Sequence, residues 1–74
     1  MEITLNGARR VAQEGTTVAG LLEELQIRPD RVAVEVNLQI LDRESFGQHG
    51  LREGDRVEII SFIGGGSKAV TGDA

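Results

Sequence analysis

The chain has 74 residues, enough for one small domain, and contains no cysteine, so disulfides and thiolate metal sites are excluded. Its net charge is −4, and its only aromatic residues are two phenylalanines. Nucleic-acid binding typically needs a basic surface and aromatic stacking, so we expect no nucleic-acid partner but a protein partner with a basic docking face.

The first predicted element is a hairpin. Residues 2–5 alternate polar and apolar side chains, and Asn6-Gly7 separates them from a second extended run at residues 8–12. Asn-Gly favours a two-residue hairpin turn because both residues tolerate positive φ. We expect Ile3, Leu5 and Val11 to face the core.

An amphipathic helix is predicted next. The hydroxyl of Thr16 or Thr17 is suited to cap its N-terminus. The apolar face has the spacing i, i+3, i+4, i+7 and consists of Val18, Leu21, Leu22 and Leu25. Gly20 predicts a close approach to the sheet, since glycine costs about 1 kcal/mol relative to alanine inside a helix. Arg28-Pro29 should end the helix, because the residue before proline resists the α region.

Three further extended runs follow the helix. Residues 31–36 place three valines on one face, Asn37 permits a turn, and residues 38–41 form a short strand. Residues 42–50 are irregular, with one helical turn near Ser45 and with Phe46 closing the open end of the core. Gly54 is expected to be left-handed in a tight turn before the last strand.

The order of these elements predicts the fold class. If the last strand pairs beside the first, the sheet is mixed and wraps over the helix. We therefore predict an α+β fold of the β-grasp type, with a mixed sheet of four to five strands packed on one helix; another small α+β arrangement is the alternative.

The last strand, Arg56 to Ile63, runs directly into Gly64-Gly65-Gly66. Three glycines end an ordered strand, because glycine offers no side chain to pack. If Val57 and Ile59 face the core, the period of two exposes Ile60 and Phe62, and such an apolar patch indicates a docking surface. The alternative is that twist buries Phe62 under the sheet edge.

Other candidate sites are weak. His49 is the only histidine, and a lone loop histidine is more often solvated than a ligand. The carboxylates of residues 42, 44, 53 and 55 fit turns and surface positions. The glycines lack the Lys-Ser/Thr of a phosphate-binding loop. We expect no metal site, no bound cofactor and no catalytic residue in the chain itself.

Five segments carry a resemblance to a known family. These are Asn6-Gly7, residues 17–22, Val34 to Asn37, Arg43 to Phe46, and above all Leu51 to Gly66, in which Gly-Asp, an apolar strand and three glycines follow one another. Over residues 1–66 the chain resembles the sulfur carrier proteins of thiamine biosynthesis, which are ubiquitin-like β-grasp proteins.

The resemblance implies that Gly66 is the reactive residue, at the end of a flexible tail formed with Gly64 and Gly65. A partner, an adenylyltransferase like the ubiquitin-activating enzymes, would use ATP to adenylate its carboxylate. A persulfide sulfur donor would then convert it to a thiocarboxylate for thiazole synthase. Ile60, Phe62 and Ile63 would dock these partners.

Here the chain continues for eight residues beyond Gly66. We predict a β-grasp domain at residues 1–63, the glycine tail at 64–66, and a disordered extension at 67–74 that a protease removes before Ser67. Two alternatives remain: the extension is not part of the natural protein, or the chain is not an active carrier.

Alternative functions also remain open. The same carrier chemistry could serve molybdopterin, cysteine or tRNA thiolation, the chain could be a modifier conjugated to lysines, or it could be a non-catalytic β-grasp interaction domain. The N-terminus lacks a signal-peptide pattern, and no apolar run approaches the about 20 residues of a membrane span. We expect a soluble cytoplasmic protein.

Overall fold

The computed structural model of the protein describes residues 1–62 and 69–70. The strands are β1 (Glu2–Leu5), β2 (Ala8–Val11), β3 (Val32–Val36), β4 (Gln39–Ile40), β5 (Arg56–Phe62) and β6 (Ala69–Val70). The α-helix α1 spans Val18–Glu24, and 3-10 helices span Pro29–Arg31 and Arg43–Ser45. None of the helices described is long and apolar enough to cross a membrane.

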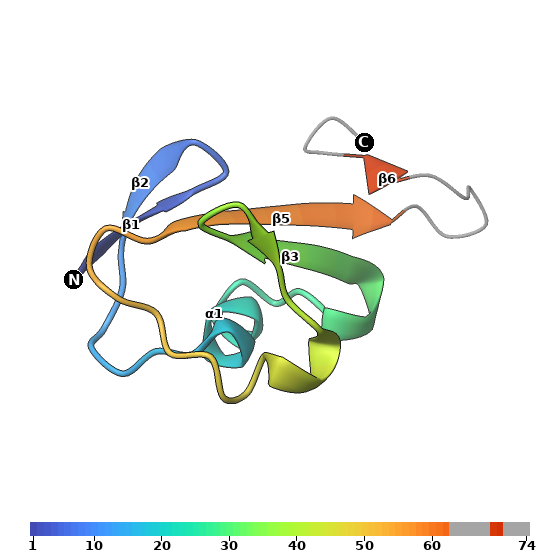
Figure 1. The fold of residues 1–74 in the computed structure, drawn as a ribbon, viewed down its shortest axis with the longest axis horizontal. Coiled ribbons are helices and arrows are strands. Elements are labelled where there is room, and N and C mark those ends of the chain that lie inside the picture. Colours follow the sequence, from blue (N-terminus) through green and yellow to red (C-terminus); the bar gives the residue numbers. More distant parts are fainter. Residues whose placement is uncertain (63–68, 71–74) are drawn as a thin grey trace.

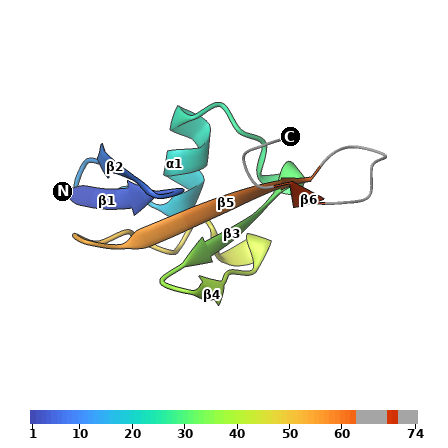
Figure 2. The same cartoon turned by 90° about the horizontal axis from the view of Figure 1, so that it is seen from above.

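One mixed sheet contains all of these strands. Its strand order is β2-β1-β5-β3-β4, and β6 also pairs with β5. β1 and β5 are parallel, whereas the other pairs are antiparallel. The sheet has α1 on one face and the last long strand at its centre (Figures 1 and 2). The predicted α+β, β-grasp architecture is confirmed.

The β1–β2 hairpin confirms the turn but not every inward side chain. Asn6 and Gly7 have φ of 49° and 86°, as the predicted turn requires. Ile3 is buried, whereas Val11 is 77% exposed, so its predicted inward orientation is wrong. The register explains this: Ile3 lies opposite Arg10, and directly opposite residues share a face, so Val11 next to Arg10 points the other way.

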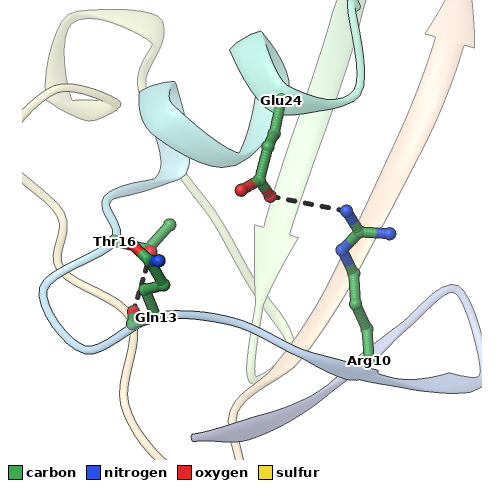
Figure 3. Close-up of polar contacts among 4 residues, drawn as sticks. All are labelled: Arg10, Gln13, Thr16 and Glu24. Atoms are coloured by element: carbon green, nitrogen blue, oxygen red, sulfur yellow. Dashed lines mark hydrogen bonds and ion pairs between the residues drawn. The ribbon is translucent and has the colours of Figure 1, made fainter.

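Arg10 therefore lies on the helix side of the sheet. Its Nη2 is 3.4 Å from Oε1 of Glu24 at the end of α1 (Figure 3). Beyond the strand, Ala12 takes the buried position that was predicted for Val11. The same figure shows the turn before the helix, where the Thr16 hydroxyl donates to the Gln13 carbonyl at 2.7 Å.

Helix α1 begins as predicted. Oγ1 of Thr17 accepts a hydrogen bond from the Gly20 amide at 3.1 Å and caps the helix. The side chains of the predicted apolar face are buried at three positions and half-buried at the fourth: Val18, Leu21, Leu22 and Leu25. A Cβ at Gly20 would lie 3.4 Å from Oγ1 of Thr17 and would meet no sheet residue, so the predicted close approach to the sheet is wrong.

The helix ends earlier than predicted. Its last residue is Glu24, well before Pro29. Gln26 has φ of 60°, and the Ile27 amide donates to the Leu22 carbonyl at 2.9 Å. This is the Schellman arrangement, which closes a helix with a left-handed residue and here uses glutamine instead of the usual glycine.

The remaining core elements follow the prediction closely. Val32, Val34 and Val36 of β3 are buried, although the strand begins one residue later than expected. The two-residue strand β4 is shorter than the predicted residues 38–41. Phe46 follows the predicted helical turn and is 3% exposed, which confirms its place in the core, and Gly54 is left-handed with φ of 85°.

The end of the chain differs in part from the prediction. Of the extension predicted to be disordered, the structure describes Ala69 and Val70, which form strand β6 beside β5. Ile63, the glycine tail and the other residues of the extension lie outside the described residues. The division at residues 63 and 66 therefore stays a prediction.

Candidate functional site at the end of the central strand

The candidate site is the C-terminal half of β5, because the predicted reactive tail follows this strand directly. β5 pairs with β1 on one edge and with β3 on the other, so it is anchored from both sides. Among the predicted site residues, the structure describes Ile60 and Phe62. Ile63, Gly64, Gly65 and Gly66 fall outside the described residues and stay predictions.

The alternation along β5 is as predicted. Val57 and Ile59 face the core and are 0% and 5% exposed. Ile60 and Phe62 therefore lie together on the face away from α1, which we call the outer face of the sheet. Ile60 is half-buried, and Phe62 is 44% exposed, so the alternative in which twist buries Phe62 is wrong.

The neighbouring strands extend this outer face. Ala33 of β3 lies directly opposite Ile60, and beside this pair Glu35 lies opposite Glu58. Ile40 of β4 lies opposite Glu35 and is 71% exposed. The outer face thus places apolar side chains on both sides of two adjacent carboxylates, an arrangement suited to an apolar partner surface that also carries a positive charge.

The two carboxylates influence each other. A hydrogen bond with Glu58, partial loss of water and the negative charge of Glu58 raise the pKa of Glu35 above its usual range, in that order of importance. Like charges directly opposite each other are unfavourable in a sheet. The period-two pattern places Glu35 and Glu58 on the outer face, but their juxtaposition also depends on the register of β3 with β5.

Two asparagines hold β5 in place, and sequence reasoning missed this role. The Asn6 side chain accepts from the Ile59 amide at 2.8 Å and donates to the Ile59 carbonyl at 3.4 Å, so it continues the ladder where β1 ends. On the other edge, Oδ1 of Asn37 accepts from the Arg56 amide at 3.0 Å. Both asparagines have positive φ. The sequence signal that could have indicated this role is an asparagine directly after a predicted strand, because its side chain can bond to nearby backbone groups.

A shallow hollow adjoins this part of β5. It has a volume of about 290 Å³ and is lined by Asn6, Gly7, Glu58 and Ile60. It lies between the β1–β2 turn and the outer face, beside Ile60. The hollow offers a partner side chain a place close to the start of the predicted tail.

Two of the other candidates, Asp55 and Glu53, hold turns and loops of the fold through hydrogen bonds. Asp55 accepts from the Arg52 amide at 2.8 Å and from the Asn37 side chain at 3.0 Å, which accounts for both of its oxygens. Oε1 of Glu53 accepts from the Glu2 amide at 3.0 Å. His49 is half-buried and lines a polar hollow of about 370 Å³. Within residues 1–62 and 69–70, no group of His, Asp or Glu side chains could hold a metal ion.

Comparison with known proteins places this arrangement in a family. The model of the ThiS family matches residues 2–66. The sulfur carrier protein ThiS of Escherichia coli is 36% identical over 66 residues, which cover 89% of this chain and 100% of that protein. The crystal structure of the thiamine biosynthesis protein ThiS from Geobacter metallireducens superposes with a TM-score of 0.77 at 36% identity, over 89% of this chain and 100% of that one.

A longer relative is also similar. A thiazole synthase of Magnetococcus marinus is 46% identical over 66 residues. The chain spans about a fifth of the length of the thiazole synthases that it matches.

These likenesses, together with the sheet built around β5, define the class of protein: it is a small ubiquitin-like protein with the β-grasp fold, similar in sequence and structure to ThiS proteins. The match to the E. coli carrier includes the whole of that protein. The chain belongs to the ThiS family.

Proposed function

We propose that this chain carries sulfur for the thiazole ring of thiamine, as a thiocarboxylate on Gly66. The observation that carries the proposal is the family match, which ends at residue 66, the residue that the resemblance predicts to be reactive. The similarity to a segment of a thiazole synthase supports thiazole formation as the pathway, because that relative carries a carrier-like segment within the polypeptide of the synthase.

The proposed chemistry begins with a free Gly66 carboxylate, so a protease first hydrolyses the bond between Gly66 and Ser67. The carboxylate then attacks the α-phosphorus of ATP on an adenylyltransferase, which gives an acyl adenylate and releases pyrophosphate. A protein persulfide attacks the acyl carbon and expels AMP. A second thiol of the donor protein then attacks the donor's own sulfur in the resulting acyl disulfide, which forms a disulfide within the donor, breaks the original sulfur–sulfur bond and leaves the thiocarboxylate on Gly66.

The chain can act only as a substrate in these steps. It contains no cysteine, so the sulfur nucleophile and the reducing thiol come from partner proteins. Glycines suit the reactive end because a backbone without Cβ atoms fits a narrow channel and adopts positive φ without strain. ATP is bound by the adenylyltransferase, and the chain itself binds no cofactor.

The outer face of the sheet is the proposed docking surface for these partners. Ile60 and Phe62 lie on the strand that leads to Gly66, and Phe62 exposes almost half of its surface. Glu35 and Glu58 add negative charge beside this apolar pair. The adenylyltransferase and thiazole synthase would each bring a surface with apolar contacts and a basic side chain.

Mass spectrometry tests the proposal. A chain ending at Gly66 is incubated with the adenylyltransferase of the same organism, ATP and a persulfide donor, and should gain the mass difference between sulfur and oxygen. A matched chain with Gly66→Ala should react more slowly, because its Cβ crowds the acyl carbon. If the Gly66 chain gains no such mass with active enzymes, the carrier proposal is wrong.

The pathway is tested separately. The thiocarboxylate form should transfer its sulfur to thiazole synthase in a reconstituted reaction. Transfer only to an acceptor for molybdopterin, cysteine or tRNA thiolation would support the carrier chemistry and contradict the thiazole assignment. A mass ladder on lysines of other proteins would instead indicate a protein modifier.

A further inference from the structure

The edge of β5 changes its partner partway along the strand. β1 pairs with Arg56 and Val57, and its last contribution to this edge is the Asn6 side chain, which binds the backbone of Ile59. On the opposite edge, β3 continues further, because Val32 still lies opposite Ser61. Beyond Ile59, therefore, β1 no longer covers this edge of β5.

Backbone geometry shows which groups this edge presents. The N–H and C=O groups of successive strand residues point to opposite edges. Those of Ile59 point toward Asn6, so those of Ser61, two residues later, point to the same edge. Ser61 is thus the next residue of β5 that needs hydrogen-bond partners on this side.

Strand β6 supplies the neighbour at this position. Val70 lies opposite Ser61 and Ala69 lies opposite Phe62, in an antiparallel pair. Since β3 already occupies the other edge of β5 at Ser61, β6 lies on the edge where β1 has ended. Figure 1 shows β6 beside the C-terminal end of β5.

We propose that the edge of β5 at Ser61 is a strand-accepting site, which β6 covers in the full-length chain and which a strand of the adenylyltransferase occupies once β6 has left. The proposal rests on the proposed function, because the event that removes β6 is the cleavage before Ser67. The extension is then more than a blocking group on Gly66. It also withholds the unprocessed chain from its partner.

The physical reason is the cost of an open edge. An uncovered strand edge presents unpaired backbone groups, which pair readily with another extended segment. A segment of the same chain has a high effective concentration and covers this edge before a partner arrives. After cleavage this intramolecular competitor diffuses away, and Ser61 can pair with the partner.

Two proline substitutions in the full-length chain test the pairing. In an antiparallel pair, hydrogen-bonded and non-hydrogen-bonded positions alternate. Because the polar groups of Ser61 face β6, Ser61 and Val70 form the hydrogen-bonded position, and the Ala69 amide points away from β5. Val70→Pro removes a donor to β5, whereas Ala69→Pro removes an amide that an edge strand leaves to solvent.

The readout is amide hydrogen exchange at Ser61. We expect exchange to be about fivefold slower in the parent chain and in Ala69→Pro than in Val70→Pro, which corresponds to about 1 kcal/mol. The Ile59 amide, held by Asn6, is the internal control and should exchange equally in all three chains. Equal exchange at Ser61 in all three chains would overturn the proposal.

A second measurement tests competition with the partner. A site that is open for only about one sixth of the time weakens apparent binding in proportion. Val70→Pro should therefore bind the purified adenylyltransferase about fivefold more tightly than the parent chain and Ala69→Pro do. If Val70→Pro frees the Ser61 amide but binds with unchanged affinity, β6 does not compete with this partner, and the proposal is wrong.

These measurements are distinguishable from a failure of the proposed function. Hydrogen exchange and binding of the uncleaved variants do not require a free Gly66 carboxylate. A trimmed chain that gains no sulfur would refute the carrier chemistry and leave the Ser61 result standing. Normal thiocarboxylate formation together with rapid exchange of the Ser61 amide in the parent chain would refute the strand-accepting site and leave the carrier chemistry standing.

Discussion

Phe62 offers the sharpest test of whether the outer face is a docking surface. Its side chain is 44% exposed on the strand that precedes the proposed reactive residue, Gly66. A phenylalanine presents about 200 Å² in total, so about 90 Å² of it remains for a partner to bury. At about 25 cal/mol per Å², burial of this area contributes about 2 kcal/mol to binding, or about thirtyfold in Kd.

We therefore expect Phe62→Ala to weaken binding of the adenylyltransferase by about thirtyfold in isothermal titration calorimetry. The same variant should lose only about 1–2 kcal/mol of unfolding free energy, because half of the side chain is already exposed in the free protein. Binding and stability then respond to different parts of one side chain.

Val11→Ala is the matched control for Phe62→Ala. Val11 is also an exposed apolar residue of the sheet, at 77%, but it lies on the edge strand β2 opposite Glu2. Its substitution should change the unfolding free energy by no more than about 0.5 kcal/mol. It should leave the affinity for the adenylyltransferase unchanged. Equal affinities of Phe62→Ala and the parent chain would refute the docking role, as would an equal loss in both variants.

Three further predictions concern the support of β5 and the core. Asn6→Ala should cost about 2 kcal/mol and accelerate exchange of the Ile59 amide, because it removes an acceptor and places alanine at positive φ; urea denaturation and hydrogen exchange check this. Glu58→Gln should raise the unfolding free energy at pH about 7 but not at pH about 3, because the raised pKa of Glu35 means that the folded state loses stability as pH rises through the titration of that carboxyl. Urea denaturation at both pH values checks this, and an equal gain at both would contradict it. Leu22→Ala, at a site 1% exposed, should lower the unfolding free energy by about 2–5 kcal/mol in urea, and a loss below 1 kcal/mol would show that the core relaxes around the cavity.

Much of the fold is predictable because burial follows the period of each element. The valines of β3 recur every two residues and are buried, and Leu21 and Leu22 lie where a helical spacing places them. Gly7 and Gly54 have positive φ because short turns at these points need it. In each case a local rule and the tertiary structure agree, and agreement between levels is what a foldable sequence requires.

The errors arise where local patterns leave a choice that packing decides. Val11 and Ala12 are both apolar, and only the register with β1 determines that Ala12 is buried. Pro29 correctly marks non-helical backbone, but a left-handed Gln26 ends the helix first, and glutamine is no recognised stop signal. The role of Asn6 at Ile59 depends on two strands 53 residues apart in sequence, which no local pattern reports.

The position of the docking residues limits where a partner can place its active site. Gly66 is the fourth residue after Phe62, and a fully extended chain advances at most about 3.6 Å per residue, so the Cα atoms of these two residues can be at most about 14 Å apart. If a partner binds the outer face at Phe62 and acts on Gly66, its active site must therefore lie close to that contact. Val11 lies opposite Glu2, two residues before the point at which β1 first pairs with β5, whereas Phe62 lies six residues beyond that point on β5. For the proposed docking, an apolar residue on this sheet is therefore well placed only near the end of β5, where β3 and the Asn6 side chain hold the strand in position.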